Sequence, residues 1–304
     1  MNNLGLYIGF AIIVGGLIWL TIRSLSGKDV DRRVIFIFIG IATSIPLLFN
    51  ITFSEKATPI VSKVFNKIES LPEGSNIIIS YDYGPAMAPE VDPMANAFLR
   101  HSLTKNHKVY IMALWATGQS LAASGVDSII RKEFPEKIYG QDYINIGFKA
   151  GGIGVLKVII TDIRKMYLTD VNGVDLDSLP IFDGIKSLRN MDLMISIGGG
   201  YPGVKEWVLF ASAPSHIPLA GGSAAVSAPL LYPYYPEQLV GLLGGIKAAA
   251  EYETLLKKKY PEFEKRTTPG IKMMGPQTLS HLVVIAFIII GNLSYFFGRK
   301  KKEE

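Results

Sequence analysis

Glycines directly after the apolar run Leu193–Ile197 have a spacing that other proteins use to bind phosphate groups. Gly198, Gly200 and Gly203 form G-x-G-x-x-G, the pattern of a dinucleotide-binding turn whose backbone amides hold the pyrophosphate. The acidic residue that should follow about twenty positions later is absent, because the next apolar run ends in glycines and Ser223. The motif therefore indicates a tight structural turn or a site for a small anionic or polar ligand. We expect no nucleotide and no other cofactor.

Two side chains are weak candidates for catalysis. Ser223 follows a predicted strand and two glycines whose amides could form an oxyanion hole. It lacks the G-x-S-x-G pattern of a nucleophile elbow, and its base would have to be His216 or Lys247, at spacings that are not diagnostic. Asp82, directly after the first predicted strand, is the best single carboxylate for acid–base chemistry, and a helix cap or a salt bridge is its alternative use.

Most of these residues share one position, the carboxyl end of a predicted strand. In a parallel sheet, ligands bind outside the carboxyl ends of the strands, so the ends together predict a ligand site. Glycine at such an end lets the backbone approach a ligand or a neighbouring loop. The predicted ligand-binding residues are Asp82, Tyr83, Lys149, Gly151, Gly198, Gly199, Gly200, Gly222 and Ser223.

Composition excludes several other kinds of site. The chain has 304 residues and no cysteine, which rules out disulfides, thiolate metal sites and a cysteine nucleophile. Its four histidines are scattered and the acidic residues have no ligand spacing, so we expect no metal site. The net charge of +5 is modest and the basic residues cluster beside apolar segments, which favours lipid head groups over nucleic acid.

The elements that position these residues alternate between strand and helix. Strands are predicted over 76–80, 109–114, 143–148, 193–197 and 217–220. Helices are predicted over 58–71, 90–104, 118–134, 154–167, 179–188, 203–211 and 236–260. The strands are continuous apolar runs, as expected when both sheet faces are buried. The pattern predicts an α/β domain with a Rossmann-like, mostly parallel five-stranded sheet and helices on both faces.

Three apolar segments are predicted to cross a membrane, at 4–22 and 34–53 near the N-terminus and at 279–297 near the C-terminus. They divide the chain into a membrane part over 1–53, an α/β domain over 54–278, and a last span with a basic tail over 279–304. Basic residues flank the link between the first two spans and follow the third, and such residues favour the cytoplasmic side. The N-terminus and the α/β domain are therefore predicted to lie outside the cytoplasm.

Three functions fit these expectations. The first is a non-catalytic component that binds a partner within a larger membrane assembly, the partner being another membrane protein or a second copy. The tyrosine- and proline-rich stretch Leu230–Pro236 suits a partner protein, a glycan or the lipid interface. The second is a sensor or transport accessory domain that binds a small polar or anionic ligand. The third is a membrane-anchored hydrolase.

Overall fold

The computed structural model describes residues 3–26, 31–53, 55–266 and 268–303. Contacts divide the chain into two units, which are described separately below. One consists of Met1–Ser54 with Ile271–Glu304, and the other of Glu55–Gly270. The predicted cytoplasmic loop between the first two spans lies partly outside the described residues, at 27–30.

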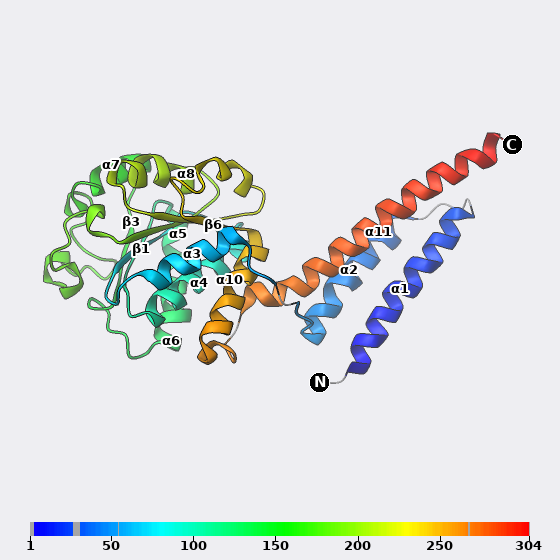
Figure 1. The fold of residues 1–304 in the computed structure, drawn as a ribbon, viewed down its shortest axis with the longest axis horizontal. Coiled ribbons are helices and arrows are strands. Elements are labelled where there is room, and N and C mark those ends of the chain that lie inside the picture. The colour runs from blue at the N-terminus through cyan, green and yellow to red at the C-terminus, as the bar shows by residue number, and fades with distance from the viewer. Residues whose placement is uncertain (1–2, 27–30, 54, 267, 304) are drawn as a thin grey trace. The chain divides into compact units, whose positions relative to one another are not determined.

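The unit Glu55–Gly270 contains a six-stranded parallel sheet in the order β3-β2-β1-β4-β5-β6 (Figure 1). The strands are β1 (Asn76–Tyr81), β2 (Lys108–Ala113), β3 (Tyr143–Phe148), β4 (Leu193–Ile197), β5 (Leu219–Ser223) and β6 (Gly241–Gly244). The central strand β1 places Ile79 beside Ile111 of β2 and beside Ile195 of β4. The predicted α/β fold with a parallel sheet is thereby confirmed.

The prediction of five strands is wrong, because β6 was assigned to a helix over 236–260. The glycines of Gly241–Gly244 are typical of a closely packed helix, but here they let a helix lie against an edge strand. A Cβ on Gly241 would lie 2.3 Å from the carbonyl oxygen of Ile60 in α3 (Pro59–Ser70). The fifth strand runs later than predicted, so Gly222 and Ser223 lie within β5 instead of beyond it.

Helices cover both faces of the sheet (Figure 1). One face carries α3, α4 (Ala88–Thr104), α5 (Ala116–Gly125), a π-helical turn over Val126–Ile130, α6 (Arg131–Glu133) and α10 (Gly245–Lys259). The other carries α7 (Ile153–Ile159), α8 (Val204–Trp207), a π-helical turn over Val208–Ser212 and α9 (Ala213–Ser215). Each face of the sheet packs against its helices to form a hydrophobic core. Side chains of β1 alternate between these two cores, with Ile77 and Ile79 in the first and Ile78 in the second.

Two predicted helices are largely replaced by short turns. The helix expected over 154–167 ends at Ile159, and Asp162 instead caps a 3₁₀ turn over Ile163–Lys165. The segment expected as a helix over 179–188 contains the 3₁₀ turn Pro180–Phe182, which is followed by Gly184 at φ +74°. A positive φ interrupts a right-handed helix, so the pattern of apolar residues alone was misleading there.

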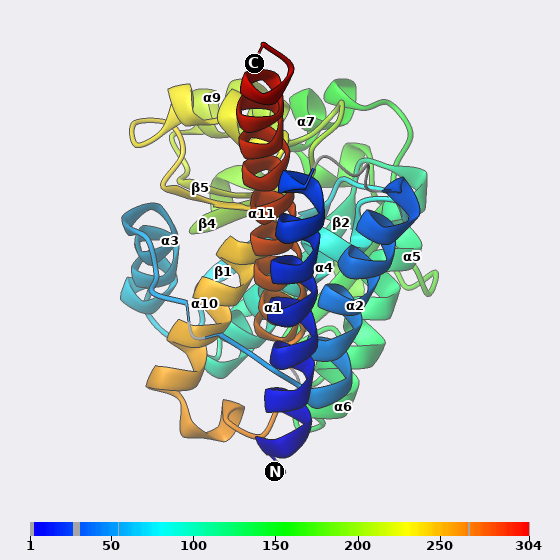
Figure 2. The same cartoon turned by 90° about the vertical axis from the view of Figure 1, so that its right-hand side faces the viewer.

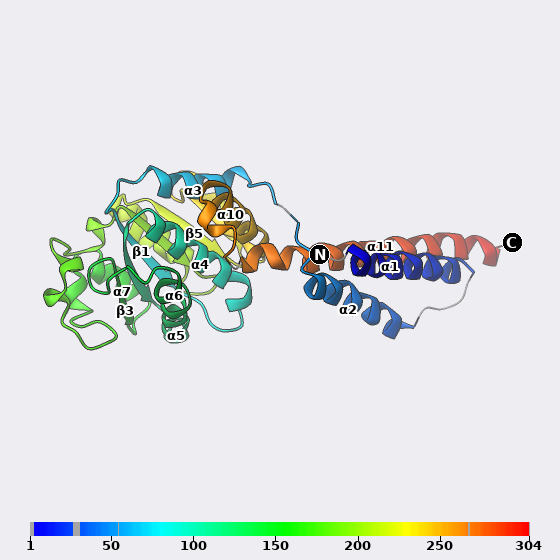
Figure 3. The same cartoon turned by 90° about the horizontal axis from the view of Figure 1, so that it is seen from below.

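The second unit is helical. It contains α1 (Asn3–Leu25), α2 (Arg32–Phe49) and the part of α11 (Pro269–Glu303) that begins at Ile271. Figure 2 and Figure 3 both show these three helices side by side. Their packed interior contains Ile13 of α1, Ala42 of α2, and Leu279 and Val283 of α11.

Among the described residues, one helix is long and apolar enough to cross a membrane, over Pro269–Phe296. The apolar helices Ala11–Leu25 and Arg33–Phe49 are shorter, at 10–17 residues. At 1.5 Å per residue, ~17 residues cover roughly 26 Å of a hydrocarbon core that is ~30 Å thick. Three candidate spans were predicted and one is found, and it begins ten residues earlier than expected.

Candidate functional site

The strand order reverses between β1 and β4, and open α/β sheets bind ligands in the crevice at such a point. In this chain the side chains of Trp115 and Met87 pack against two glycines of the turn. A Cβ on Gly200 would lie 2.5 Å from the ring of Trp115, and one on Gly199 would lie 2.7 Å from the end of Met87. The indole nitrogen of Trp115 also donates to the carbonyl of Pro202 at 2.8 Å. These glycines thus give room to Trp115 and Met87.

The carboxylate of Asp82 is fully buried and accepts four hydrogen bonds. Oδ1 accepts from the Ser80 hydroxyl at 2.6 Å and from the Leu114 amide at 2.8 Å. Oδ2 accepts from the Ser196 hydroxyl at 3.1 Å and from Nε1 of Trp207 at 2.7 Å. Burial raises the pKa of Asp82 to about 6, although all four hydrogen bonds oppose the rise. Asp82 therefore joins β1, β2, β4 and α8 from a position without contact to solvent.

Tyr83 and Lys149 have different surroundings. Tyr83 is buried and its hydroxyl donates to Asp92 at 2.7 Å, and burial raises its pKa. Lys149 is exposed, and its ammonium lies 5.7 Å from the ring centroid of Tyr167. Gly151 follows Lys149 in the loop after β3 and has φ +133°. The next residue, Gly152, lies near Pro202 in the turn after β4, since a Cβ on it would be 3.8 Å from the Pro202 ring.

Ser223 is buried at the carboxyl end of β5, where its hydroxyl donates to the carbonyl of Ala224 at 3.2 Å. Neither proposed base is hydrogen-bonded to it. His216 precedes the amino end of the same strand, in a left-handed conformation. Lys247 forms ion pairs with Glu251 and Glu55. In this geometry Ser223 lacks the activating hydrogen bond that a serine nucleophile uses.

A cavity of about 100 Å³ lies at the carboxyl ends of β4 and β5. Its lining is Gly198, Gly199, Gly200, Val204, Lys205, Glu206, Ser223, Ser227, Leu230 and Leu231. The cavity brings together four predicted residues, the three glycines and Ser223, whereas Asp82, Tyr83, Lys149, Gly151 and Gly222 are not part of its lining.

Two further polar residues of the lining, Glu206 and Ser227, were not predicted. Glu206 accepts from the Gly203 amide at 2.8 Å, and Ser227 donates to the carbonyl of Gly199 at 3.3 Å. A glutamate three residues after a helix-capping position is a recognisable signal, so Glu206 could have been found from its spacing to Gly203.

Exposed apolar side chains crowd the loops that line this cavity. We call Tyr201, Val226, Leu230 and Tyr232 the apolar rim, because all four follow β4 or β5 and are exposed. Val226 is 84% exposed and Leu230 is 74% exposed.

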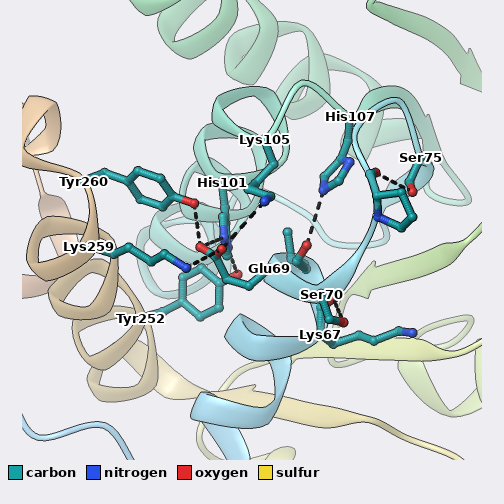
Figure 4. A network of polar contacts seen from close by, with 12 residues as sticks. Lys67, Glu69, Ser70, Ser75, His101, Lys105, His107, Tyr252, Lys259 and Tyr260 are labelled. Carbon is teal, nitrogen blue, oxygen red and sulfur yellow. Dashed lines mark hydrogen bonds and ion pairs between the residues drawn. The ribbon is translucent and has the colours of Figure 1, made fainter.

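A separate polar network joins α3, α4 and the end of α10 (Figure 4). Glu69 accepts from His101 at 2.9 Å, from Tyr260 at 2.6 Å and from Lys259 at 2.6 Å. The other ring nitrogen of His101 lies 2.6 Å from the hydroxyl of Tyr252. Burial lowers the pKa of His101 and would raise that of Glu69, but its three donors together hold the pKa of Glu69 well below its usual range. The network fastens three helices to one another, with His101 fully buried.

No family model matches the chain, and no curated protein matches its sequence. Within the described residues, no group of three or more histidine, aspartate or glutamate side chains is arranged to hold a metal ion.

Proposed function

We propose that this protein is a membrane-anchored, non-catalytic component that binds a partner protein through the apolar rim. The observation that carries the proposal is the exposure of the large aliphatic side chains of Val226 and Leu230 on the loop after β5. Leaving such side chains in water is unfavourable by roughly 1.5–3 kcal/mol each relative to burying them, and a partner removes that cost. Tyrosine, which occurs twice in the rim, is enriched in protein interfaces.

The state of the catalytic candidates supports a binding role. Asp82 is closed off by four hydrogen bonds, and Ser223 bonds to a backbone carbonyl. The hydrolase alternative would need both a base and a substrate path at these residues. The ligand-binding alternative is favoured by the cavity beside the rim.

Membrane anchoring is supported by the surface of the helical unit. Large apolar side chains such as Ile18, Phe36 and Ile288 are exposed on α1, α2 and α11. Polar side chains there find partners within the helical unit: Thr21 bonds to Leu17 and Asn292 to Ile288 in their own helices, and Thr43 of α2 bonds to Ser280 of α11. Satisfying polar groups within the segment is what a hydrocarbon environment requires. We therefore propose that all three helices span the membrane, with the C-terminus cytoplasmic and the α/β domain outside, following the placement of basic residues.

The test compares native assemblies of the full chain extracted from its own membrane in mild detergent. We expect the wild-type protein to migrate in a complex larger than one chain, with partners identified by mass spectrometry. Leu230→Asp should release the chain from that complex. The control is Ile138→Asp, which changes an aliphatic side chain that is 54% exposed but outside the rim. A wild-type chain that is extracted alone, or a complex that Leu230→Asp leaves intact, would overturn the proposal.

A further inference from the structure

The cavity at the ends of β4 and β5 contains a buried carboxylate that is only half used. Glu206 is 7% exposed, and its Oε2 accepts from the Gly203 amide at 2.8 Å. Within the described part of the chain, Oε1 of Glu206 takes part in no hydrogen bond. A carboxylate oxygen in such a position is stabilised strongly by a charged donor, so a ligand ammonium group suits this wall of the cavity.

Groups that suit an anion line the same cavity. Lys205 is exposed beside Glu206 and forms no ion pair with any described residue. The amides of Gly199 and Gly200 likewise donate to no described group. Successive free amides in a glycine turn form a small anion-binding concavity, and Ser223 belongs to the same lining. A ligand carboxylate is the anion that fits beside an ammonium group in so small a space.

The remaining walls are aliphatic and close together. Val204 and Leu231 are buried, and Leu230 stands at the exposed side of the cavity. The volume of the cavity is about 100 Å³. It therefore has room for a short aliphatic group between Val204 and Leu231.

We propose that this cavity binds a free α-amino acid with a small aliphatic side chain, in its zwitterionic form. Glu206 receives the ammonium group, Lys205 and the glycine amides receive the carboxylate, and Val204 with Leu231 surround the side chain. This goes beyond partner binding. Leu230 belongs to both the cavity and the apolar rim, whereas Glu206 and Lys205, which the tests below change, lie outside the rim.

The test uses isothermal titration calorimetry on the full chain in nanodiscs, with defined small molecules as probes. L-valine and L-alanine should bind at least tenfold more tightly than isobutylamine, which lacks the carboxylate, and isobutyrate, which lacks the ammonium group. Absence of valine and alanine binding, or equal binding of isobutylamine, would overturn the proposal. L-valinamide represents the first residue of a polypeptide, and binding of L-valinamide as tight as that of L-valine would also overturn it, in favour of a peptide N-terminus.

Variants separate a loss of the site from a loss of the fold. Glu206→Gln keeps an oxygen for the Gly203 amide but replaces the other oxygen by an amide NH₂ group. This group is a hydrogen-bond donor and cannot accept from a ligand ammonium group. The variant should weaken valine binding at least tenfold while the melting temperature changes little. Lys205→Met should also weaken valine binding, but should leave isobutylamine binding unchanged. The matched control is Glu136→Gln, an exposed glutamate outside the cavity, which should bind valine like the wild type. A folded Glu206→Gln protein with unchanged valine affinity would overturn the proposal.

Discussion

The indole nitrogen of Trp207 donates a 2.7 Å hydrogen bond to Oδ2 of Asp82, joining the helix after β4 to the end of β1. Both residues are fully buried. Trp207→Phe keeps most of the ring but removes the donor, leaving the carboxylate one hydrogen bond short. We expect the free energy of unfolding to fall by about 1–3 kcal/mol, the cost of an unsatisfied buried group.

The measurement is thermal unfolding of the full chain in detergent, followed by circular dichroism. Trp19→Phe is the matched control, because Trp19 is an exposed tryptophan in α1 and its substitution should have little effect. Equal melting of Trp207→Phe and wild-type protein would show that the hydrogen bond does not support the fold.

The raised pKa of Asp82 predicts a particular dependence of stability on pH. The native carboxyl holds its proton up to about pH 6, whereas the unfolded chain releases it near the ordinary value of 3.8. Between these values the native state binds more protons, so this contribution to stability is present below about pH 4 and is lost as pH rises through 6. Its full size is on the order of 3 kcal/mol.

The check is the difference in stability between the wild type and Asp82→Asn from pH 4 to pH 7. The difference should fall by that amount as pH rises. His101 acts in the opposite direction, because its lowered pKa makes stability rise with pH towards 6.5, but it is present in both proteins and cancels. A difference that stays constant with pH would contradict a raised pKa at Asp82.

Much of the sheet could be predicted because its strands are unbroken apolar runs. The bounds predicted for Tyr143–Phe148 and Leu193–Ile197 agree with β3 and β4. The strand Gly241–Gly244 was missed, since its glycines are explained only by the nearby helix α3, which is distant in sequence. Local patterns do not report contacts of that kind.

The candidate site divides in the same way. The rule that ligand sites lie at carboxyl ends of strands led to Gly198–Gly200 and Ser223, and the cavity joins them. No pattern could show that the ring of Trp115 lies against Gly200, or that Trp207 closes over Asp82, because both contacts depend on loops that meet only in the folded chain.

Two glycine substitutions should change stability in opposite directions. A Cβ on Gly198 would lie 2.5 Å from the backbone oxygen of Asp82, which cannot move without disturbing β1. Gly198→Ala should therefore lower the free energy of unfolding by about 1–3 kcal/mol. A Cβ on Gly154, in α7, would meet nothing within 4 Å, so Gly154→Ala should raise it by about 0.5–1 kcal/mol through helix propensity. Melting temperatures of both variants provide the test, and equal shifts would refute the close approach of β4 to β1.

Glu69→Gln should weaken the attachment of α10. The amide keeps the shape of the side chain but removes the charge to which His101, Lys259 and Tyr260 donate. Hydrogen bonds to charged groups contribute about 1.5–3 kcal/mol, so we expect a loss of about 2 kcal/mol in stability. Hydrogen exchange should also become faster in the last turns of α10, Leu255–Lys259. Glu136→Gln is the control, and unchanged exchange in Glu69→Gln would show that the network does not hold this helix.

The contact between α1 and α2 can be tested with two neighbouring glycines. A Cβ on Gly16 would lie 2.1 Å from the ring of Phe38, whereas one on Gly15 would meet nothing within 4 Å. Gly16→Ala should force Phe38 aside and lower the stability of the helical unit by about 1–3 kcal/mol, measured by unfolding in mixed micelles with increasing dodecyl sulfate. Gly15→Ala should be neutral or slightly stabilising, because alanine is the better helix former. If both variants unfold at the same detergent fraction, then α1 and α2 do not pack through Gly16 and Phe38. The pair is informative because the substitution is the same, the helix is the same, and only the face that receives the methyl group differs.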